Sequence, residues 1–275
     1  MSASGYDWEP LIAISALTDL GLKRSNNQDS LVVDLASHLA DWRERGHLFV
    51  VADGMGAHAA GELASKLAVD QVAYLYRKHR DRSPNDALLA AIQAANDDIH
   101  RRGQANLSFH NMGTTCSSLL LLPQGAVVAH VGDSRVYVCR HGVLRQLTFD
   151  HSLVWEMQQA TQSYGGQAEL SFPKNVITRS IGPHASVKID LEGPFAIEMG
   201  DTFLLCSDGL TGRVDDGEIA SSLTYLSSDR AARLLLDLAL LRGGHDNITL
   251  IVIRIQGDDL VTRASGTSPL TVGDP

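Results

Sequence analysis

Short apolar runs that alternate with turn residues dominate this sequence and limit the folds open to it. Runs typical of β-strands cover residues 11–18, 30–35, 47–52, 115–122, 126–132, 135–140, 202–207 and 248–255. Turn signals such as LPQG at 122–125 and RHG at 140–142 leave only a few residues between neighbouring runs. Strands joined so closely pair as antiparallel hairpins, because a parallel pair needs a long crossover. The sequence therefore predicts largely antiparallel sheets.

Helical patterns occur before and after the central strands. Residues 60–78 place leucines and valines near one face. A second helix is predicted to begin at Ser83 as N-cap, with Pro84 in its first turn. A third covers about 229–242 and ends at Gly243. This order favours antiparallel sheets with helices packed outside them over alternating βαβ units.

Composition narrows the class of protein. The chain has 275 residues, of which 44% are hydrophobic, so it can bury a sizeable core. Its net charge of −9 disfavours nucleic acids and anionic membranes as partners. No secretion signal opens the sequence, and no apolar run approaches the ~20 residues of a membrane span, so a cytoplasmic monomer is expected. Cysteines without zinc or redox spacing are expected to be buried and reduced: Cys116, Cys139 and Cys206.

Aspartates stand where several apolar runs meet polar loops. These residues are Asp29, Asp53, Asp133, Asp208 and Asp246. Each one taken alone is most often part of an ordinary turn. Carboxylates that converge at one sheet edge need a cation, and oxygen ligands suit Mg²⁺ or Mn²⁺ better than zinc. The residue types are compatible with a metal site, but spacing alone does not establish that the aspartates meet.

A series of motifs resembles one enzyme family in order. GLKRSNNQD, FVVADGMGAHAAGE, MGTTC, VAHVGDSRVYV, LTFDHSLV, NVITRSIG, DTFLLCSDGLT and GGHDNITLIVI extend over about residues 12–254. Together they are similar to the motifs of the metal-dependent protein serine/threonine phosphatases, the protein phosphatase 2C (PPM) family, in its bacterial form. The resemblance implies an α+β fold with a central sandwich of two antiparallel β-sheets flanked by α-helices, in four layers. It also implies one catalytic domain over residues 1–256, followed by a disordered tail over 257–275.

The same resemblance implies a set of metal ligands. By match to the motifs, Asp53 bridges two core ions, Mg²⁺ or Mn²⁺, and the Gly54 carbonyl binds the second ion. Asp208 and Asp246 complete the coordination of the first ion, and Asp133 is a ligand of a third ion that is held more loosely. A glycine beside Asp53 also lets the backbone approach a ligand closely.

Two further residues take roles at the phosphate. Arg24 matches the phosphate-binding arginine, whose planar fork suits a dianionic group, although a solvated loop arginine is the alternative. His58 is a candidate general acid for the leaving alkoxide, or else a structural loop histidine. His151 and His245 are expected to be structural.

The chain also departs from the family pattern. Asp29 would hold metal-bound waters, but Gln28 stands where the family commonly has Glu, so an altered metal affinity is expected. Ala57 replaces a glycine of the opening motif. Residues 155–172, in the segment that the family uses as a flap, lack its usual pattern. Substrate choice is therefore left open.

The implied reaction is metal-dependent hydrolysis of phosphoserine and phosphothreonine in proteins. A hydroxide between two ions about 4 Å apart would attack phosphorus in line, without a phosphoenzyme. The partners would be phosphorylated proteins and a bacterial Ser/Thr kinase whose action the chain opposes. Two alternatives stay open, a catalytically silent phosphoprotein-binding module on the same fold and a small-molecule phosphoesterase.

Overall fold

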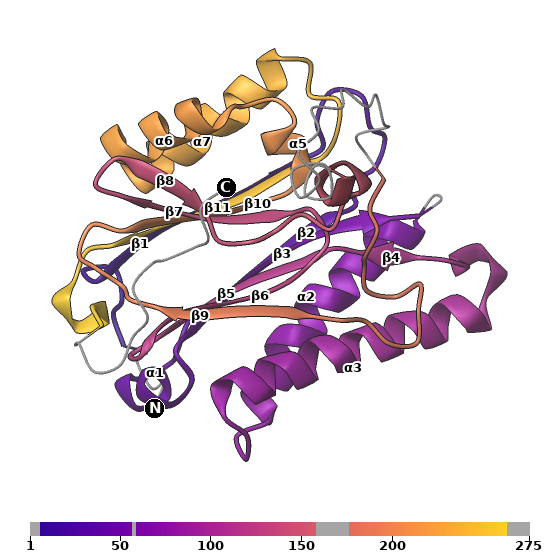
Figure 1. Cartoon of the computed structure of the whole chain (residues 1–275), viewed down its shortest axis with the longest axis horizontal. Coiled ribbons are helices and arrows are strands. Elements are labelled where there is room, and N and C mark those ends of the chain that lie inside the picture. The colour runs from indigo at the N-terminus through magenta and orange to yellow at the C-terminus, as the bar shows by residue number, and fades with distance from the viewer. Residues whose placement is uncertain (1–5, 57–58, 158–175, 263–275) are drawn as a thin grey trace, which may run out of the picture.

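Two β-sheets pack face to face between two sets of helices (Figure 1). This computed structural model describes residues 6–56, 59–157 and 176–262. The strands are β1 (Ile12–Asp19), β2 (Asp29–Asp34), β3 (His47–Met55), β4 (Gly113–Thr114), β5 (Cys116–Leu122), β6 (Gly125–Val131), β7 (Arg135–Arg140), β8 (Val143–Gln146), β9 (Asp190–Phe195), β10 (Thr202–Cys206) and β11 (Ile248–Ile255). The helices are α1 (Leu39–Arg45), α2 (Ala60–Lys78), α3 (Pro84–Ala105), α5 (Asp208–Thr211), α6 (Asp216–Tyr225) and α7 (Ser228–Leu241), with 3₁₀ turns η1 (Leu107–Phe109) and η2 (Asp258–Leu260).

Strand order confirms the predicted antiparallel sandwich. One sheet runs β1-β11-β10-β7-β8, and the other runs β2-β3-β5-β6-β9 with β4 beside β3. Every pairing between these strands is antiparallel. Helices α2 and α3 cover the outer face of the second sheet, and α6 and α7 cover the first (Figure 1). The fold is therefore the four-layer α+β sandwich that the family resemblance implies.

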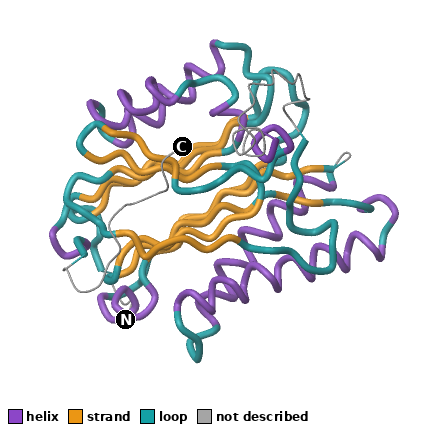
Figure 2. The backbone as a smooth tube through the Cα atoms, in the orientation of Figure 1, coloured by secondary structure: helices purple, strands orange, loops and turns teal. Residues whose placement is uncertain are grey.

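The layers explain why β3 and β11 read as continuous apolar runs. In β3, Leu48 and Val50 face α2 and α3, whereas Phe49 and Val51 face the opposite sheet. All four side chains are fully buried. A strand covered on both faces loses the apolar–polar alternation of a half-exposed strand. Figure 2 shows this arrangement as two layers of strands enclosed by helices.

Helix ends follow the local signals. Ser83 caps α3 by accepting a hydrogen bond from the Asp86 N–H at 3.2 Å, and Pro84 is its first residue. The predicted helix over 60–78 matches α2, and α7 ends just before Gly243. Helix α6 was not predicted, because only Ile219 and Leu223 among its large apolar residues are fully buried. The three cysteines are buried and free, as expected.

The chain stays packed beyond the boundary expected at residue 256. Leu260 is buried against the inter-sheet core, and the Gly257 N–H donates to the Leu11 carbonyl at 3.0 Å. The Thr262 N–H donates to the Ile197 carbonyl at the same distance. The polar composition after Gln256 hides this one apolar anchor, so the prediction of disorder from 257 is wrong as far as Thr262; residues 263–275 lie outside the described residues. None of the described helices has the length and apolar character needed to cross a membrane.

Candidate metal centre

Strand pairing brings two of the predicted aspartates together. In the register of β2 with β3, Asp29 lies directly opposite Asp53. Asp29 Oδ2 also accepts a 2.7 Å hydrogen bond from the hydroxyl of Ser207, which lies just after β10 in the other sheet. The Ser207 N–H donates to the Thr249 carbonyl in β11 at 3.0 Å. The two sheets therefore meet at Asp29, and Asp208 follows at the start of α5.

The carboxylates of this region also influence one another's pKa. Burial, then the charges of Asp29, Asp208, Asp133 and Asp246, raise the pKa of Asp53 well above its usual range. The pKa of Asp208 is also raised, first by burial and then by the charge of Asp246. Carboxylates that raise one another's pKa in this way are stabilised by a proton or a cation that offsets their repulsion.

Two carboxylate oxygens in this cluster are unsatisfied. Asp29 Oδ1 and Asp133 Oδ1 are buried and have no hydrogen-bond partner among the described residues. Burial is the main cause that raises the pKa of each of these carboxyl groups to about 7. A buried acceptor without a partner costs about 1–3 kcal/mol. A bound cation or its waters would satisfy both oxygens.

The cluster is nevertheless not a preformed set of metal ligands. Within the described ranges, no group of three or more His, Cys, Asp or Glu side chains is assembled so that it could hold a metal ion by itself. Hard ions such as Mg²⁺ keep several waters and use few carboxylates, so separated aspartates still fit them. Arg24 also lies in the cluster, with its Nη2 2.6 Å from Asp246 Oδ2. The donor set therefore fits hydrated Mg²⁺ or Mn²⁺ rather than a dry, four-ligand ion.

Gly54 follows Asp53 where backbone segments nearly touch. A Cβ at Gly54 would lie 2.1 Å from the Gly61 carbonyl oxygen and 2.5 Å from that of Gln28. The Gly54 N–H donates to the Gln28 carbonyl at 3.1 Å, and Gln28 Nε2 donates to the Gly56 carbonyl at 3.3 Å. Gln28 therefore supports the loop after β3 through an amide contact.

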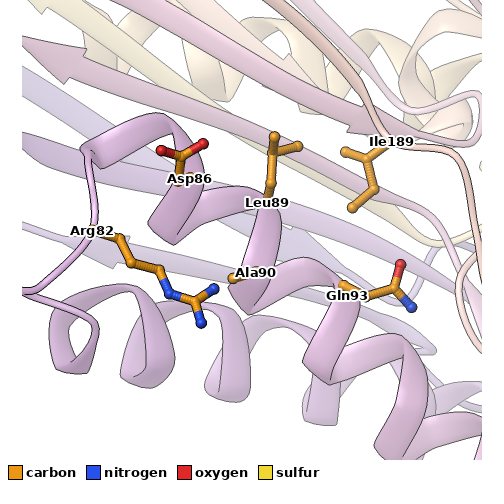
Figure 3. Close-up of a pocket in the computed structure, with 6 residues that line it drawn as sticks. All are labelled: Arg82, Asp86, Leu89, Ala90, Gln93 and Ile189. Carbon is orange, nitrogen blue, oxygen red and sulfur yellow. The ribbon is translucent and has the colours of Figure 1, made fainter.

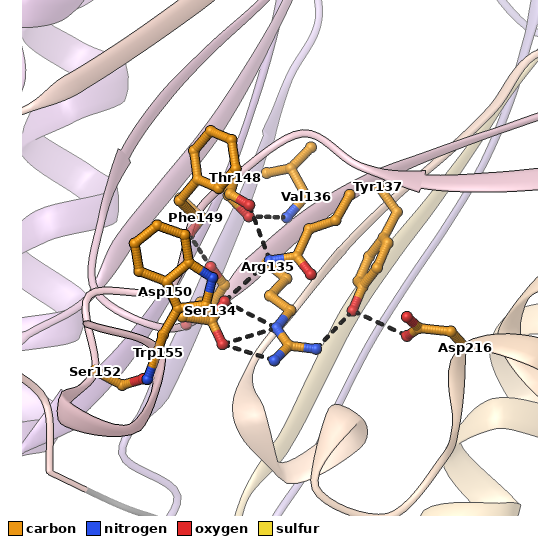
Figure 4. A network of polar contacts seen from close by, with 12 residues as sticks. Ser134, Arg135, Val136, Tyr137, Thr148, Phe149, Asp150, Ser152, Trp155 and Asp216 are labelled. Atoms are coloured by element: carbon orange, nitrogen blue, oxygen red, sulfur yellow. Dashed lines mark hydrogen bonds and ion pairs between the residues drawn. The ribbon is translucent and has the colours of Figure 1, made fainter. Parts of the chain in front are cut away.

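Three of the predicted aspartates, Asp133, Asp208 and Asp246, line a cleft of about 640 Å³. Its lining comprises Asp133, Arg135, Asp150, Ser152, Val154, Trp155, Asp208, Gly209, Thr211, Gly212, Arg213, His245 and Asp246. One wall is braced by Arg135, whose guanidinium binds both oxygens of Asp150, at 2.9 Å from Nε and 2.6 Å from Nη2 (Figure 4). Arg135 also donates to Tyr137 Oη at 3.0 Å, so this arginine is fully engaged in the wall.

A depression of similar volume, about 660 Å³, lies on α3 (Figure 3). Its lining comprises Arg82, Asp86, Leu89, Ala90, Gln93 and Ile189. None of the aspartates at the strand ends contributes to it, and Asp86 is its only carboxylate. The cleft beside Asp208 is therefore the stronger candidate for chemistry.

The predicted histidines have different surroundings. His58 lies outside the described residues, as do Ala57 and most of segment 155–172, so the general-acid hypothesis stays a prediction. His151 has structural contacts, since its Nδ1 accepts from the Gly132 N–H at 3.0 Å and its Nε2 pairs with Asp190 at 2.9 Å. His245 was expected to be structural, but it is exposed and lines the cleft.

Sequence reasoning missed several residues that shape this site. Ser207 and Arg135 had a usable signal, since Ser207 directly precedes Asp208 in SDG and Arg135 is two residues after Asp133 in GDSR. Asn247 accepts from the Gln28 N–H at 2.8 Å and donates to the Leu20 and Asn26 carbonyls. Its contacts are more than 200 positions away, so no local pattern could reveal them.

Comparisons with known proteins agree with this geometry. The family profile described as protein phosphatase 2C matches residues 23–233. A putative protein phosphatase 2C-type of Streptococcus pyogenes is 38% identical, with 90% of this chain and 99% of the relative covered. Protein phosphatase PhpP of Streptococcus pneumoniae is 36% identical, with 90% and 98% covered.

Solved structures show the same likeness. The Mycobacterium tuberculosis serine/threonine phosphatase PstP/Ppp superimposes with a TM-score of 0.75 at 33% identity, covering 90% of this chain and all of that one. The catalytic domain of PstP in complex with two manganese ions gives a TM-score of 0.71 at 32% identity, covering 89% and 98%. By sequence and by structure, this chain belongs to the protein phosphatase 2C family of serine/threonine protein phosphatases.

Proposed function

We propose that this chain hydrolyses phosphoserine and phosphothreonine in proteins with the help of Mg²⁺ or Mn²⁺. The observation that carries the proposal is that Asp29 lies opposite Asp53 and accepts a hydrogen bond from Ser207, the neighbour of Asp208, while its buried Oδ1 has no partner among the described residues. The Mycobacterium tuberculosis relative named as a serine/threonine phosphatase, and the PstP catalytic domain solved with two manganese ions, support this substrate class and these ions.

The residues that would hold the ions come from both sheets. Asp53 and the Gly54 carbonyl at the end of β3, with Asp208 and Asp246, would serve two core ions. Asp133 would serve a third. When bound, such ions lower the pKa of water and offset the charge that develops on a transferring phosphoryl group. Asp29 would accept hydrogen bonds from the waters around the ions, since its Oδ1 lacks any other partner in the described chain.

Arg24 would bind the phosphoryl group of the substrate. Its side chain is half exposed at the cluster and already forms one short ion pair, with Asp246. A guanidinium can hold two phosphoryl oxygens at once, which fixes the orientation of the phosphorus for in-line attack. Loss of the Asp246 partner to a cation would free Arg24 for this role. Protonation of the leaving alkoxide by His58 remains part of the proposal.

Residues 1–262 would act as a single catalytic domain that opposes a bacterial Ser/Thr kinase. The names of the relatives support the reaction class, and the cognate kinase has to be found by experiment. Kinases add the phosphoryl groups that such an enzyme removes, so the substrates would be shared between the two proteins.

Activity assays with defined metals test the proposal. Hydrolysis of p-nitrophenyl phosphate and of phosphopeptides should require Mn²⁺ or Mg²⁺ and stop with EDTA. Full activity in Asp53→Ala or Asp208→Ala would contradict it. Calorimetry separates the silent-module alternative, because such a module should bind Mn²⁺ poorly. Faster turnover of nucleotides than of phosphopeptides would favour the small-molecule alternative.

A further inference from the structure

Of the two arginines that line the cleft, Arg213 is the one whose guanidinium has no partner among the described residues. The other arginine in the lining, Arg135, is engaged by Asp150 and Tyr137. Among the described residues, the guanidinium of Arg213 forms no hydrogen bond and no ion pair, although it lines the same cavity as Asp208. A half-buried cation loses part of its hydration, so it favours an anionic partner.

The backbone holds Arg213 in a defined place. Its N–H donates to the Leu210 carbonyl in α5 at 3.0 Å. Its carbonyl accepts from Arg242 Nη1 at 2.8 Å, and Arg242 is itself clamped by Glu218 at 2.5 Å. Helix α5 begins at Asp208, so a short and rigid segment connects the candidate metal ligand to Arg213. The fold therefore fixes the backbone of Arg213 five residues after Asp208, beside the same cleft.

The other residues of the lining make Arg213 the favourable position for an anionic group of the substrate. Most ionisable groups of the cleft are carboxylates: Asp150 binds Arg135, and Asp133, Asp208 and Asp246 are the candidate metal ligands. An anionic group on the substrate would meet repulsion from Asp133 or Asp208 wherever these are not neutralised. Arg213 offers it a favourable position in the same cavity.

From this arrangement we propose that Arg213 is a specificity-determining residue, which binds a second negative group of the substrate close to the phosphorylated residue. The inference rests on the proposed phosphatase function. The chemistry fits an acidic side chain or a second phosphoryl group, because a guanidinium binds carboxylate and phosphate in the same bidentate way. Proteins phosphorylated in acidic or multiply phosphorylated segments would be the preferred substrates.

Matched phosphopeptides test this proposal on the Mn²⁺-loaded protein. One series carries a single glutamate at successive positions beside the phosphothreonine, a second replaces it by glutamine, and a third by phosphoserine. The wild-type chain should show a higher kcat/KM for the glutamate or the phosphoserine series than for glutamine, by about three- to tenfold, as expected for a partly exposed ion pair. The two anionic arms separate carboxylate from phosphate as the group recognised.

Variants of Arg213 then test whether this residue causes the preference for anionic phosphopeptides. Arg213→Gln should abolish the ratio between the anionic and glutamine series, and Arg213→Glu should invert it. Arg230→Glu makes the same charge change at an exposed position of α7 outside the cleft lining, and it should keep the wild-type ratio. Thermal unfolding checks that each variant is folded.

The outcomes are distinguishable. The assignment would be overturned if both Arg213 variants kept the wild-type ratio of kcat/KM between anionic and glutamine peptides, or if Arg230→Glu lost this ratio to the same extent. Either result would leave the phosphatase function in place. A wild-type chain that hydrolyses no phosphopeptide at all would overturn the proposed function and this inference together.

Discussion

Arg24 Nη2 lies 2.6 Å from Asp246 Oδ2, although the two residues are 222 positions apart in the chain. The hydrogen bond with Asp246 is the main cause that raises the pKa of Arg24. The pair joins a candidate phosphate ligand to a candidate metal ligand. A cation at Asp246 and the arginine therefore compete for the same carboxylate.

This competition predicts opposite effects on two measurements. Arg24→Ala should raise KM for a phosphopeptide about tenfold, equivalent to roughly 1.4 kcal/mol of lost phosphate binding. The same variant should bind Mn²⁺ as tightly as the wild type or more tightly, because Asp246 is freed. Steady-state kinetics and titration calorimetry measure the two. Weaker Mn²⁺ binding in Arg24→Ala would show that the arginine supports the ion instead of competing with it.

Asp53→Asn should raise the stability of the metal-free protein and abolish its phosphatase activity. An amide of the same size removes a charge that is partly buried among Asp29, Asp208 and Asp133. We expect loss of Mn²⁺ binding and of phosphatase activity, together with about 1 kcal/mol of added stability in EDTA, as is common when a functional site is neutralised. Urea unfolding in EDTA checks the stability, with the exposed Asp70→Asn as a control. A destabilised Asp53→Asn protein would argue against repulsion in the cluster.

Gly54→Ala should damage the site through sterics alone. Its Cβ would collide with the carbonyl oxygens of Gly61 and Gln28, which belong to backbone and cannot turn away. We expect a loss of about 1–3 kcal/mol of stability and weaker Mn²⁺ binding, measured by thermal unfolding and calorimetry.

A matched control for this change is Gly217→Ala. There the nearest atom to the new Cβ is an oxygen of the Asp215 side chain at 3.2 Å, and the residue lies in α6. Alanine favours a helix over glycine, so this variant should keep its Mn²⁺ affinity and lose no stability. Equal effects of the two substitutions would contradict the steric explanation.

His47 should make the fold sensitive to acid. Its ring stacks on Trp42 at 4.6 Å, and its Nδ1 accepts from the Ala36 N–H at 3.0 Å. Burial, with the charge of Arg77, lowers the pKa of His47 to about 3. The unfolded chain takes up the proton near pH 6.5 and the folded chain does not, so stability falls as pH falls from about 6.5 to 3.

The size of this effect is about 1.4 kcal/mol per pH unit for one histidine. Denaturant unfolding across this pH range should show a smaller slope in His47→Gln than in the wild type, whatever the stability of the variant at neutral pH. His130, whose pKa is likewise lowered by burial to about 3, leaves a residual slope in both proteins. Identical slopes would contradict a neutral, buried His47.

Local patterns predicted much of the fold, and their failures have physical causes. The cap at Ser83 and the end of α7 depend on near neighbours in sequence, so both were predicted correctly. Helix α6 was missed because its few buried residues give a weak periodic pattern. Leu260 was missed because two adjacent apolar residues, Leu260 and Val261, within a polar segment form no periodic pattern.

The site was harder to predict than the fold. Residues at strand ends could be picked out as candidates, and the register that sets Asp29 opposite Asp53 is a property of strand pairing. The contact between Ser207 and Asp29 joins residues 178 positions apart and needs the two sheets to be packed first. Only the resemblance to a known family anticipated that the aspartates converge. Neither local pattern nor family resemblance could show that the guanidinium of Arg213 has no partner among the described residues.

Because its aspartates come from both sheets, the centre lies across the seam of the sandwich. The apolar layer between the sheets, with Phe49, Val51 and Ile251, then sets how far apart the two halves of the centre stand. This layer is a spacer for the chemistry as well as a source of stability. A change of side-chain volume deep in the core, with no contact to any ligand, would alter the distance between catalytic groups.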